Sequence, residues 1–142
     1  MFGKVHVLRV KPGQELMSEI TGYCQQNGIS SGVILGIIGS IESARLGRTQ
    51  ELPAPGKYEY AYKDYTRPLS IISGQGTIAL MDDKLMLHIH VLLSGPGTNE
   101  GGHLVEARVW ATAEVVIGEL ERQLQRSIDP ETGLSTLQPS PP

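Results

Sequence analysis

Residues 85–93 read Leu-Met-Leu-His-Ile-His-Val-Leu-Leu, an apolar run that two histidines interrupt. This pattern predicts a β-strand, in which side chains two residues apart point to the same side, with Cα atoms about 6.5 Å apart. The apolar residues at odd positions from 87 to 93 then form one face, which we expect to fill the core. His88 and His90 form the other face. Two unpaired imidazoles are costly to bury, so this face should border a cleft or a subunit interface.

A third histidine follows within a short stretch of chain. His103 lies in Gly-Gly-His-Leu at 101–104, after a segment at 94–102 that is rich in Gly, Pro and Asn and that we predict as a loop. Three neutral imidazoles with an open fourth position suit zinc, at Zn–N distances of about 2.0–2.1 Å. We therefore predict a metal site of His88, His90 and His103. A histidine on a strand is often a hydrogen-bonded structural residue, and that alternative stays open for each one.

Three polar residues near His103 are candidates for a supporting role. Asn99 and Glu100, in the predicted loop, are placed to position a water molecule or to act as a base, although a solvated loop explains them equally. Glu106 alternates with Arg108 on the strand after His103. The two residues either support the metal ligands or form an exposed pair. Catalytic residues are not identifiable from the sequence.

The N-terminal half of the chain predicts strands around one helix. A strand is expected at 5–10 and a helix at 14–27, which Asn27-Gly28 ends. The apolar helix positions fall at helical spacing and form one face: Leu16, Ile20, Tyr23 and Cys24. The β-branched run at 32–39 predicts a strand covered on both faces, with bulges at its glycines. A further strand is expected at 43–49.

The C-terminal half predicts a meander of strands. A loop at 52–56 precedes a tyrosine-rich stretch at 58–62. The segments that follow are a strand at 69–73, a turn at 74–76, a strand at 77–81, a turn at 82–84, the histidine strand, β-structure at 105–117 and a hairpin at 126–137.

Length and composition fit a globular chain. The chain has 142 residues, of which 39% are hydrophobic and 19% are charged. We therefore expect a single domain at 1–138, followed by a disordered, proline-rich tail at 139–142. The 17 glycines favour β-structure and tight turns over a helical bundle. The predicted class is α/β (α+β): a mixed, largely antiparallel sheet with one main helix.

Charge and cysteine content restrict the environment and the partners. The net charge is −3 and the basic residues are dispersed, which argues against strong binding of nucleic acid by a monomer. Cys24 is the single cysteine, so no internal disulfide is expected and the compartment is expected to be reducing. No secretory signal or membrane-spanning stretch is recognisable, and the expected location is the cytoplasm.

Four short motifs occur in an order and spacing that resemble a known family. They are Gly-Ile-Ile-Gly at 36–39, Leu-His-Ile-His at 87–90, Gly-Gly-His-Leu at 101–104 and Thr-Ala-Glu-Val-Val-Ile at 112–117. From about residue 5 to 137, the chain resembles the plants-and-prokaryotes-conserved (PPC) domain family of the stand-alone prokaryotic type. The resemblance implies a homotrimer of α/β domains with a largely antiparallel sheet. It also implies zinc binding at His88, His90 and His103.

Two functions follow from these expectations. The first is a trimeric metal-binding protein, with zinc on three histidines, that takes a small-molecule ligand and acts as a metal-dependent hydrolase. The alternative is a DNA-associated or regulatory interaction module without catalysis. Plant relatives bind A·T-rich DNA through AT-hook motifs, but this chain contains no Arg-Gly-Arg core, so we expect weak DNA binding or none.

Overall fold

The chain folds as an antiparallel β-sheet against which one helix packs. The structure, a computed structural model, describes residues 2–50 and 58–139. The elements are β1 (Phe2–Val10), α1 (Leu16–Gln26), β2 (Gly32–Thr49), β3 (Tyr60–Tyr65), β4 (Leu69–Met81), β5 (Lys84–Gly95), β6 (Thr98–Leu120), β7 (Arg126–Ile128) and β8 (Ser135–Leu137). The predicted fold class is confirmed. The loop predicted at 52–56 and residues 140–142 of the predicted tail lie outside the described residues.

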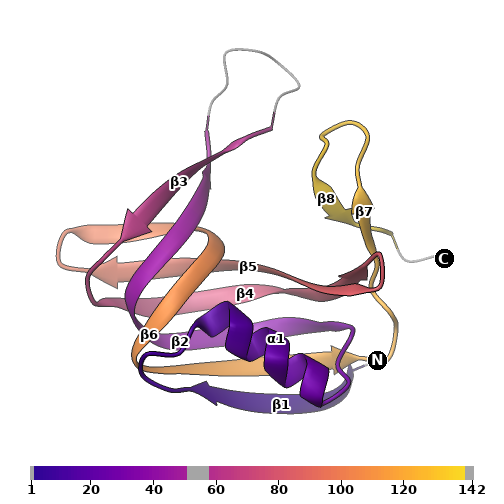
Figure 1. Cartoon of the computed structure of the whole chain (residues 1–142), viewed down its shortest axis with the longest axis horizontal. Coiled ribbons are helices and arrows are strands. Elements are labelled where there is room, and N and C mark those ends of the chain that lie inside the picture. Colours follow the sequence, from indigo (N-terminus) through magenta and orange to yellow (C-terminus); the bar gives the residue numbers. More distant parts are fainter. Residues whose placement is uncertain (1, 51–57, 140–142) are drawn as a thin grey trace.

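Strand β2 joins the two sides of the sheet. The strand order is β1-β6-β5-β4-β2-β3, and β2 pairs in addition with β6. Since β2 pairs with both β4 and β6, the strands β2, β4, β5 and β6 form a closed ring of neighbours. Figure 1 shows β1, β6 and part of β2 together in a lower layer, with α1 against it, while the far end of β2 rises beside β3.

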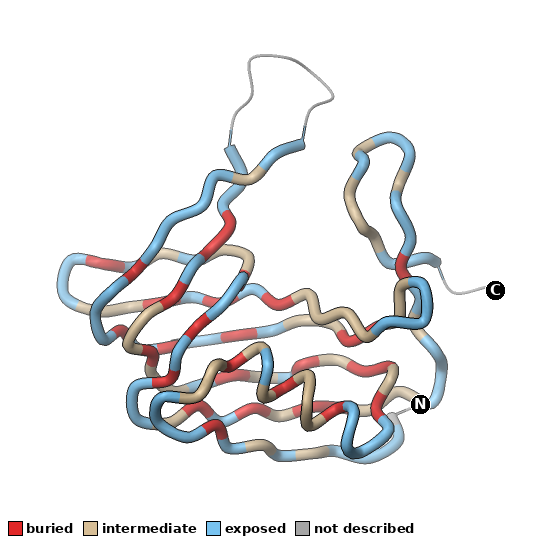
Figure 2. Tube along the Cα trace, viewed as in Figure 1, coloured by how far each residue is buried: buried red, intermediate tan, exposed pale blue. Residues whose placement is uncertain are grey.

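Alternate residues of β5 fill the interior of this ring. Ile89, Val91 and Leu93 are 0%, 5% and 1% exposed, whereas Leu87 is only partly buried against the same core. Buried positions alternate with exposed ones along the strands (Figure 2). The predicted core face of the histidine strand is confirmed, and its alternate face carries the histidines.

The helix predicted at 14–27 is α1. Three of its four predicted apolar positions, Leu16, Ile20 and Cys24, are fully buried. Burial raises the pKa of the Cys24 thiol to about 11, as expected for a core residue. The helix ends as predicted: Asn27 is the C-cap, and Gly28 follows with φ of +68° in the left-handed region.

Glu15 ties the start of α1 to β6. As the N-cap, its carboxylate accepts hydrogen bonds from Met17 N, at 3.1 Å, and from Ser18 N, at 2.7 Å. It also accepts from Ala107 N of β6 at 3.0 Å. Burial raises the pKa of Glu15, but these hydrogen bonds outweigh burial and hold the pKa below its ordinary value. The ionised carboxylate therefore stabilises the fold.

Replacing Glu15 by alanine should lower the free energy of unfolding at neutral pH by about 1–3 kcal/mol, because the cap and the bond to Ala107 are both lost. Since the folded-state pKa lies below the unfolded one, this contribution is present above the unfolded-state pKa and fades as the pH falls through the folded-state pKa. Urea unfolding of both proteins across this pH range measures it. Glu19→Ala, in the same helical turn, is the control; an equal loss in Glu19→Ala would contradict the assignment to the cap.

Strand β2 corrects two predictions. The segments predicted as separate strands at 32–39 and 43–49 form one strand that bends at bulges, with register shifts between Ile34 and Gly36 and between Gly39 and Ile41. The predicted bulges are thereby confirmed. The prediction that both faces are covered is wrong for the isolated chain: Leu35 is 46% exposed and Ile38 is 56% exposed. Among the described residues, no layer packs on the outer side of Leu35 and Ile38.

Glycines inside strands explain two further errors. The turn predicted at 74–76 is part of β4, and most of the loop predicted at 94–102 belongs to β5 and β6. At Gly76 a Cβ atom would lie 2.2 Å from the carbonyl oxygen of His88, so glycine here allows close strand approach. Gly97, with φ of +72°, does mark a turn between β5 and β6.

The predicted C-terminal hairpin is present as β7 and β8. Arg126 pairs with Leu137 and Ile128 pairs with Ser135. The segment is bonded to the end of β4, where Leu80 N donates to the carbonyl of Leu124 at 3.1 Å. Among the described residues, no helix has the length and apolarity needed to cross a membrane.

Candidate metal centre

Strand register brings the three histidines together. His88 and His90 lie on β5, and His90 faces His103 of β6 as a direct strand partner. His103 is also the partner of Gly47 on β2. The third histidine therefore lies between β5 and β2, beside the first two. The structure places the three predicted ligands in one cluster.

The cluster has the dimensions of a metal site. One ligand nitrogen from each of His88, His90 and His103 lies within 4.8 Å of the others. The Nε2 atoms of His88 and His90 are 3.2 Å apart. Two nitrogens bound to one tetrahedral zinc ion are about 3.3 Å apart, given Zn–N distances of about 2.0–2.1 Å. The three side chains could therefore hold a metal ion.

Burial keeps two of these imidazoles in the form that binds metal. It is the largest cause that lowers the pKa of His88 to about 4, and the charges of Arg126, His103 and His90 add to it. Burial also lowers the pKa of His103, followed by the charges of His90 and Arg126. A neutral imidazole offers a lone pair, whereas an imidazolium does not.

His103 has an unused nitrogen. Its Nδ1 atom is buried and has no hydrogen-bond partner among the described residues. Buried polar atoms are nearly always paired, so an unpaired one indicates a missing partner such as an ion or a water molecule. This nitrogen supports a ligand-binding role for the cluster.

Arg126 contacts the cluster and was not identified from the sequence. Its Nη2 lies 3.1 Å from Nδ1 of His88, and the residue is 8% exposed. Burial lowers the pKa of its guanidinium. Arg126 comes from β7, 38 residues from His88, and no local pattern marks it. The contact between Arg126 and His88 depends on how the hairpin of β7 and β8 packs against β5.

The guanidinium determines where His88 carries its proton. Because arginine only donates hydrogen bonds, Nδ1 of His88 accepts and the neutral ring is protonated at Nε2. This Nε2–H group then donates to Nε2 of His90 at 3.2 Å. If Nε2 of His88 were to hold a metal ion, the ring proton would have to move to Nδ1, and Arg126 would have to release its hydrogen bond.

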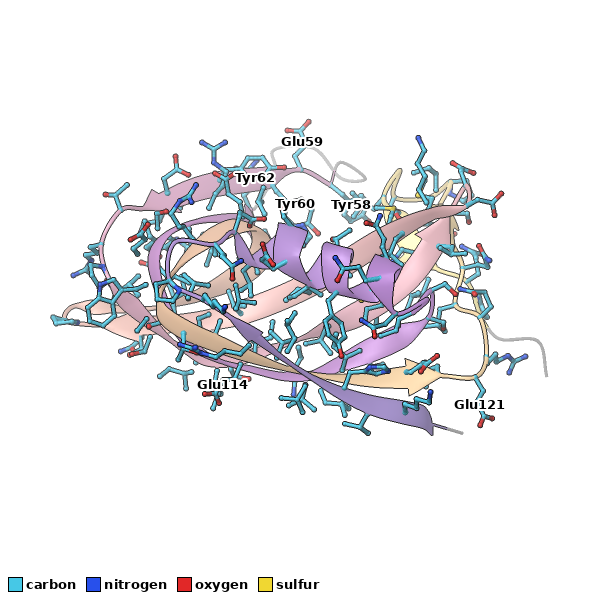
Figure 3. All side chains as sticks on the ribbon, turned by 60° about the horizontal axis from the view of Figure 1, so that its bottom comes forward. Tyr58, Glu59, Tyr60, Tyr62, Glu114 and Glu121 are labelled. Carbon is cyan, nitrogen blue, oxygen red and sulfur yellow. The ribbon has the colours of Figure 1, made fainter. Side chains whose placement is uncertain are left out.

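Tyr60 is a second neighbour that sequence analysis did not assign. Its ring stacks on that of His103, with centroids 5.9 Å apart and planes 22° apart. Figure 3 shows Tyr58, Tyr60 and Tyr62 in a row along one side, with Glu59 pointing outward. The spacing of the tyrosines is typical of one face of a strand, but it does not indicate that Tyr60 stacks on His103.

The predicted supporting residues lie elsewhere. Asn99 accepts a hydrogen bond from Ser94 at 2.7 Å. Glu100 binds Lys63 Nζ at 2.8 Å, and it also contacts Arg48 and the hydroxyl of Tyr65. These carboxylate contacts lower the pKa of Glu100, with Lys63 first and Tyr65 next. None of the hydrogen bonds described for these two residues involves a histidine of the cluster.

Glu106 and His6 are also separate from the cluster. Glu106 pairs in register with Arg45 and lines a different cavity, of about 240 Å³, with Asp64 and Arg108. His6 contacts the hydroxyl of Tyr23 and the carboxylate of Glu119, each at 3.2 Å.

A cavity of about 370 Å³ opens beside the cluster. Its walls come from β3, β5, β6 and the C-terminal hairpin, and the lining residues are Tyr60, Met86, Leu87, His88, His103, Arg126, Leu134, Ser135 and Thr136. A cavity of this size accepts a small molecule. The metal candidates are therefore accessible to a ligand.

Comparison with known families now identifies the domain. Residues 1–121 match the model of the Plants and Prokaryotes Conserved (PCC) domain, the PPC family of the sequence resemblance. The chain belongs to this family. The bifunctional protein GlmU of Synechococcus sp. (strain JA-3-3Ab) is a curated relative of this PPC chain, 31% identical over 134 residues. The match covers 92% of this chain and only 20% of that protein.

Solved structures share the whole PPC fold. A metal-containing protein of Archaeoglobus fulgidus is 33% identical with a TM-score of 0.87, over 98% of this chain and 96% of that one. A PPC protein of Pyrococcus horikoshii is 26% identical with a TM-score of 0.83, over 99% and 95%. A protein of Bacteroides thetaiotaomicron, named a candidate DNA-binding protein, has a TM-score of 0.85 over 97% and 96%, but its 22% identity shows only the fold.

Proposed function

We propose that this PPC domain is a zinc-binding protein whose metal ligands are His88, His90 and His103. The observation that carries the proposal is the cluster itself, with one nitrogen from each histidine within 4.8 Å of the others. The unpaired Nδ1 of His103 supports it. The similarity to a metal-containing protein from Archaeoglobus fulgidus supports it as well.

The centre suits hydrolysis of a small ester or a similar carbonyl compound. His88, His90 and His103 would hold the zinc ion, which would supply a Lewis acid and lower the pKa of a bound water molecule to about 7. The protein contributes the remaining parts: Tyr60 holds the ring of His103 in place by stacking, and apolar residues around the cavity of about 370 Å³ exclude water.

Elemental analysis tests this proposal. Protein purified without a metal-affinity tag should contain one zinc per chain, and a chelator that removes the zinc should abolish turnover of a generic ester. Metal-free protein that takes up no zinc on dialysis would refute the metal site. If the metal-loaded protein had no esterase activity, the hydrolase proposal would be wrong and the metal would have a structural role.

We further propose that the chain assembles as a homotrimer. Large apolar side chains are exposed on β1, β2, β4, β5 and β6: Val5, Val7, Leu35, Ile38, Ile72, Leu92 and Trp110. Exposed apolar side chains that lie together on a sheet are typical of subunit interfaces. Closed symmetry buries such a surface without leaving an open edge.

The extent of the domain and its location are part of the same proposal. The hydrogen bond from Leu80 N to the carbonyl of Leu124 joins the C-terminal segment to β4, which supports a single domain at 1–138. We place the protein in the cytoplasm, where the single cysteine, Cys24, stays reduced.

The alternative is a DNA-associated module, which the name of the relative from Bacteroides thetaiotaomicron favours. The charges of this chain argue against it. Two arginines that an oligomer might direct at phosphates are paired with acids: Arg45 with Asp64 at 2.7 Å, and Arg48 with Glu100 at 3.4 Å. Arg67 donates to the Pro96 carbonyl.

We expect duplex DNA binding to be weak or absent near physiological salt. The net charge of −3 on each chain repels the phosphate backbone. A gel-shift titration at two salt concentrations measures this. Sub-micromolar, sequence-preferring binding by untagged protein, with a steep fall in salt, would favour the DNA-associated module.

A further inference from the structure

The C-terminal hairpin forms one wall of the histidine cavity. The match to the PPC family ends at residue 121, and β7 and β8 come after it. Arg126, Leu134, Ser135 and Thr136 from this hairpin line the cavity of about 370 Å³ together with residues of the matched domain such as His88 and His103. The shape and charge of the cavity therefore depend on a segment outside the matched domain.

Arg126 is a buried cation without a carboxylate partner. A guanidinium has five N–H donors. The acceptors here are the Ser135 carbonyl at 2.9 Å, Thr77 Oγ1 at 3.1 Å and His88 Nδ1 at 3.1 Å, all uncharged. The Nε atom has no partner, and no ion pair between described residues includes Arg126. Because an uncompensated buried charge is unfavourable, an anion in the cavity would supply the missing partner.

The other lining residues indicate which anion. Met86, Leu87 and Leu134 are apolar, and Tyr60 adds an aromatic ring. The lining of the described cavity contains no acid and no cation besides Arg126, apart from the imidazoles. One guanidinium matches the charge and the planar shape of a carboxylate, whereas a phosphate dianion requires more donors. The cavity suits a monoanion with an apolar body.

We infer that the cavity binds a small carboxylic acid, with its carboxylate on Arg126 and its apolar body against Met86 and Leu134. The inference deepens the proposed function, on which it rests for the metal ion beside Arg126, because it names the class of ligand: the acid that hydrolysis of an ester releases. A carboxylate that engages Arg126 also draws the guanidinium from Nδ1 of His88. That nitrogen is then free to carry the proton, as metal ligation through Nε2 requires. Carboxylate and zinc should each tighten the binding of the other.

Calorimetric titration with phenylacetate and with its neutral analogue phenylacetamide tests the inference. Wild-type protein should bind phenylacetate at least about tenfold more tightly than phenylacetamide, because only the acid pairs with Arg126. Arg126→Gln should lose this preference, and Arg126→Lys should keep part of it. The matched control is Arg9→Gln, which removes one positive charge from an exposed residue that bonds Thr112 and lies outside the cavity.

The wild-type comparison of acid and amide decides the question even if an Arg126 variant does not fold. Equal affinity for the two compounds, no binding at millimolar concentrations, the same loss in Arg9→Gln, or tighter binding of inorganic phosphate would overturn the inference. Each titration is run with and without one equivalent of zinc. Binding of phenylacetate without any zinc uptake would refute the metal proposal alone, and zinc uptake without phenylacetate binding would refute this inference alone.

Discussion

Replacing His103 by alanine should lower the affinity for zinc by about 100-fold or more, because only two of three protein ligands remain. His103 is the ligand that comes from β6, and it lies opposite His90 in the strand pairing. Without His103, only His88 and His90 of β5 remain to hold a zinc ion. The fold should persist, since His103 is only partly buried and the core side chains of β5 are untouched.

Competition with a chelating dye measures the affinity, and elemental analysis gives the zinc content. The control is His6→Ala, which removes a histidine that contacts Tyr23 and Glu119 and not the cluster. His6→Ala should keep full zinc content. Full occupancy in His103→Ala, with a normal circular dichroism spectrum, would exclude the three-ligand site.

The second large effect concerns assembly. Aspartates in place of Val7 and Ile38, which are 70% and 56% exposed in the isolated chain, should convert a trimer into monomers. Each substitution would place an unpaired charge in a buried interface, at a cost of several kcal/mol. Light scattering should give three times the chain mass of 15.4 kDa for the wild-type protein and the chain mass itself for the double variant.

Lys84→Asp, at the exposed start of β5, is the control for added negative charge. It should leave the trimer intact. A wild-type mass equal to one chain at micromolar concentration would rule out the trimer, and a double variant that stays trimeric would place the interface on another surface.

The histidine cluster was predictable because two of its members obey a local rule. Alternation in a strand places His88 and His90 on one face, and the buried residues at 89, 91 and 93 confirm the facing. His103 required one further element, the strand that follows a short connection. The pairing of His88 with His90 follows from the period of a strand, and the position of His103 follows from its place on the next strand along the chain.

Arg126 and Tyr60 were not predictable because they reach the cluster through long-range packing. Their contacts depend on how the hairpin and β3 are placed, and neither placement leaves a periodic signal in the chain. The errors at 74–76 and 94–102 have a different cause: glycine serves both in turns and where two strands approach closely. Gly76 allows two strands to approach closely, and composition alone does not distinguish this role of glycine from its role in turns.

The pairing of the first strand with the last long one bears on how the protein is made. The residues of β1 find their partners on β6, about a hundred positions later, as the bond from Arg9 to Thr112 illustrates with a separation of 103 residues. The ribosome must therefore synthesise the chain through β6 before β1 can pair fully. Until then β1 exposes unpaired backbone, and Val5 and Val7 are open to contact with other nascent chains. Slow synthesis of the segment between β1 and β6 would prolong that exposure, whereas rapid synthesis would shorten it.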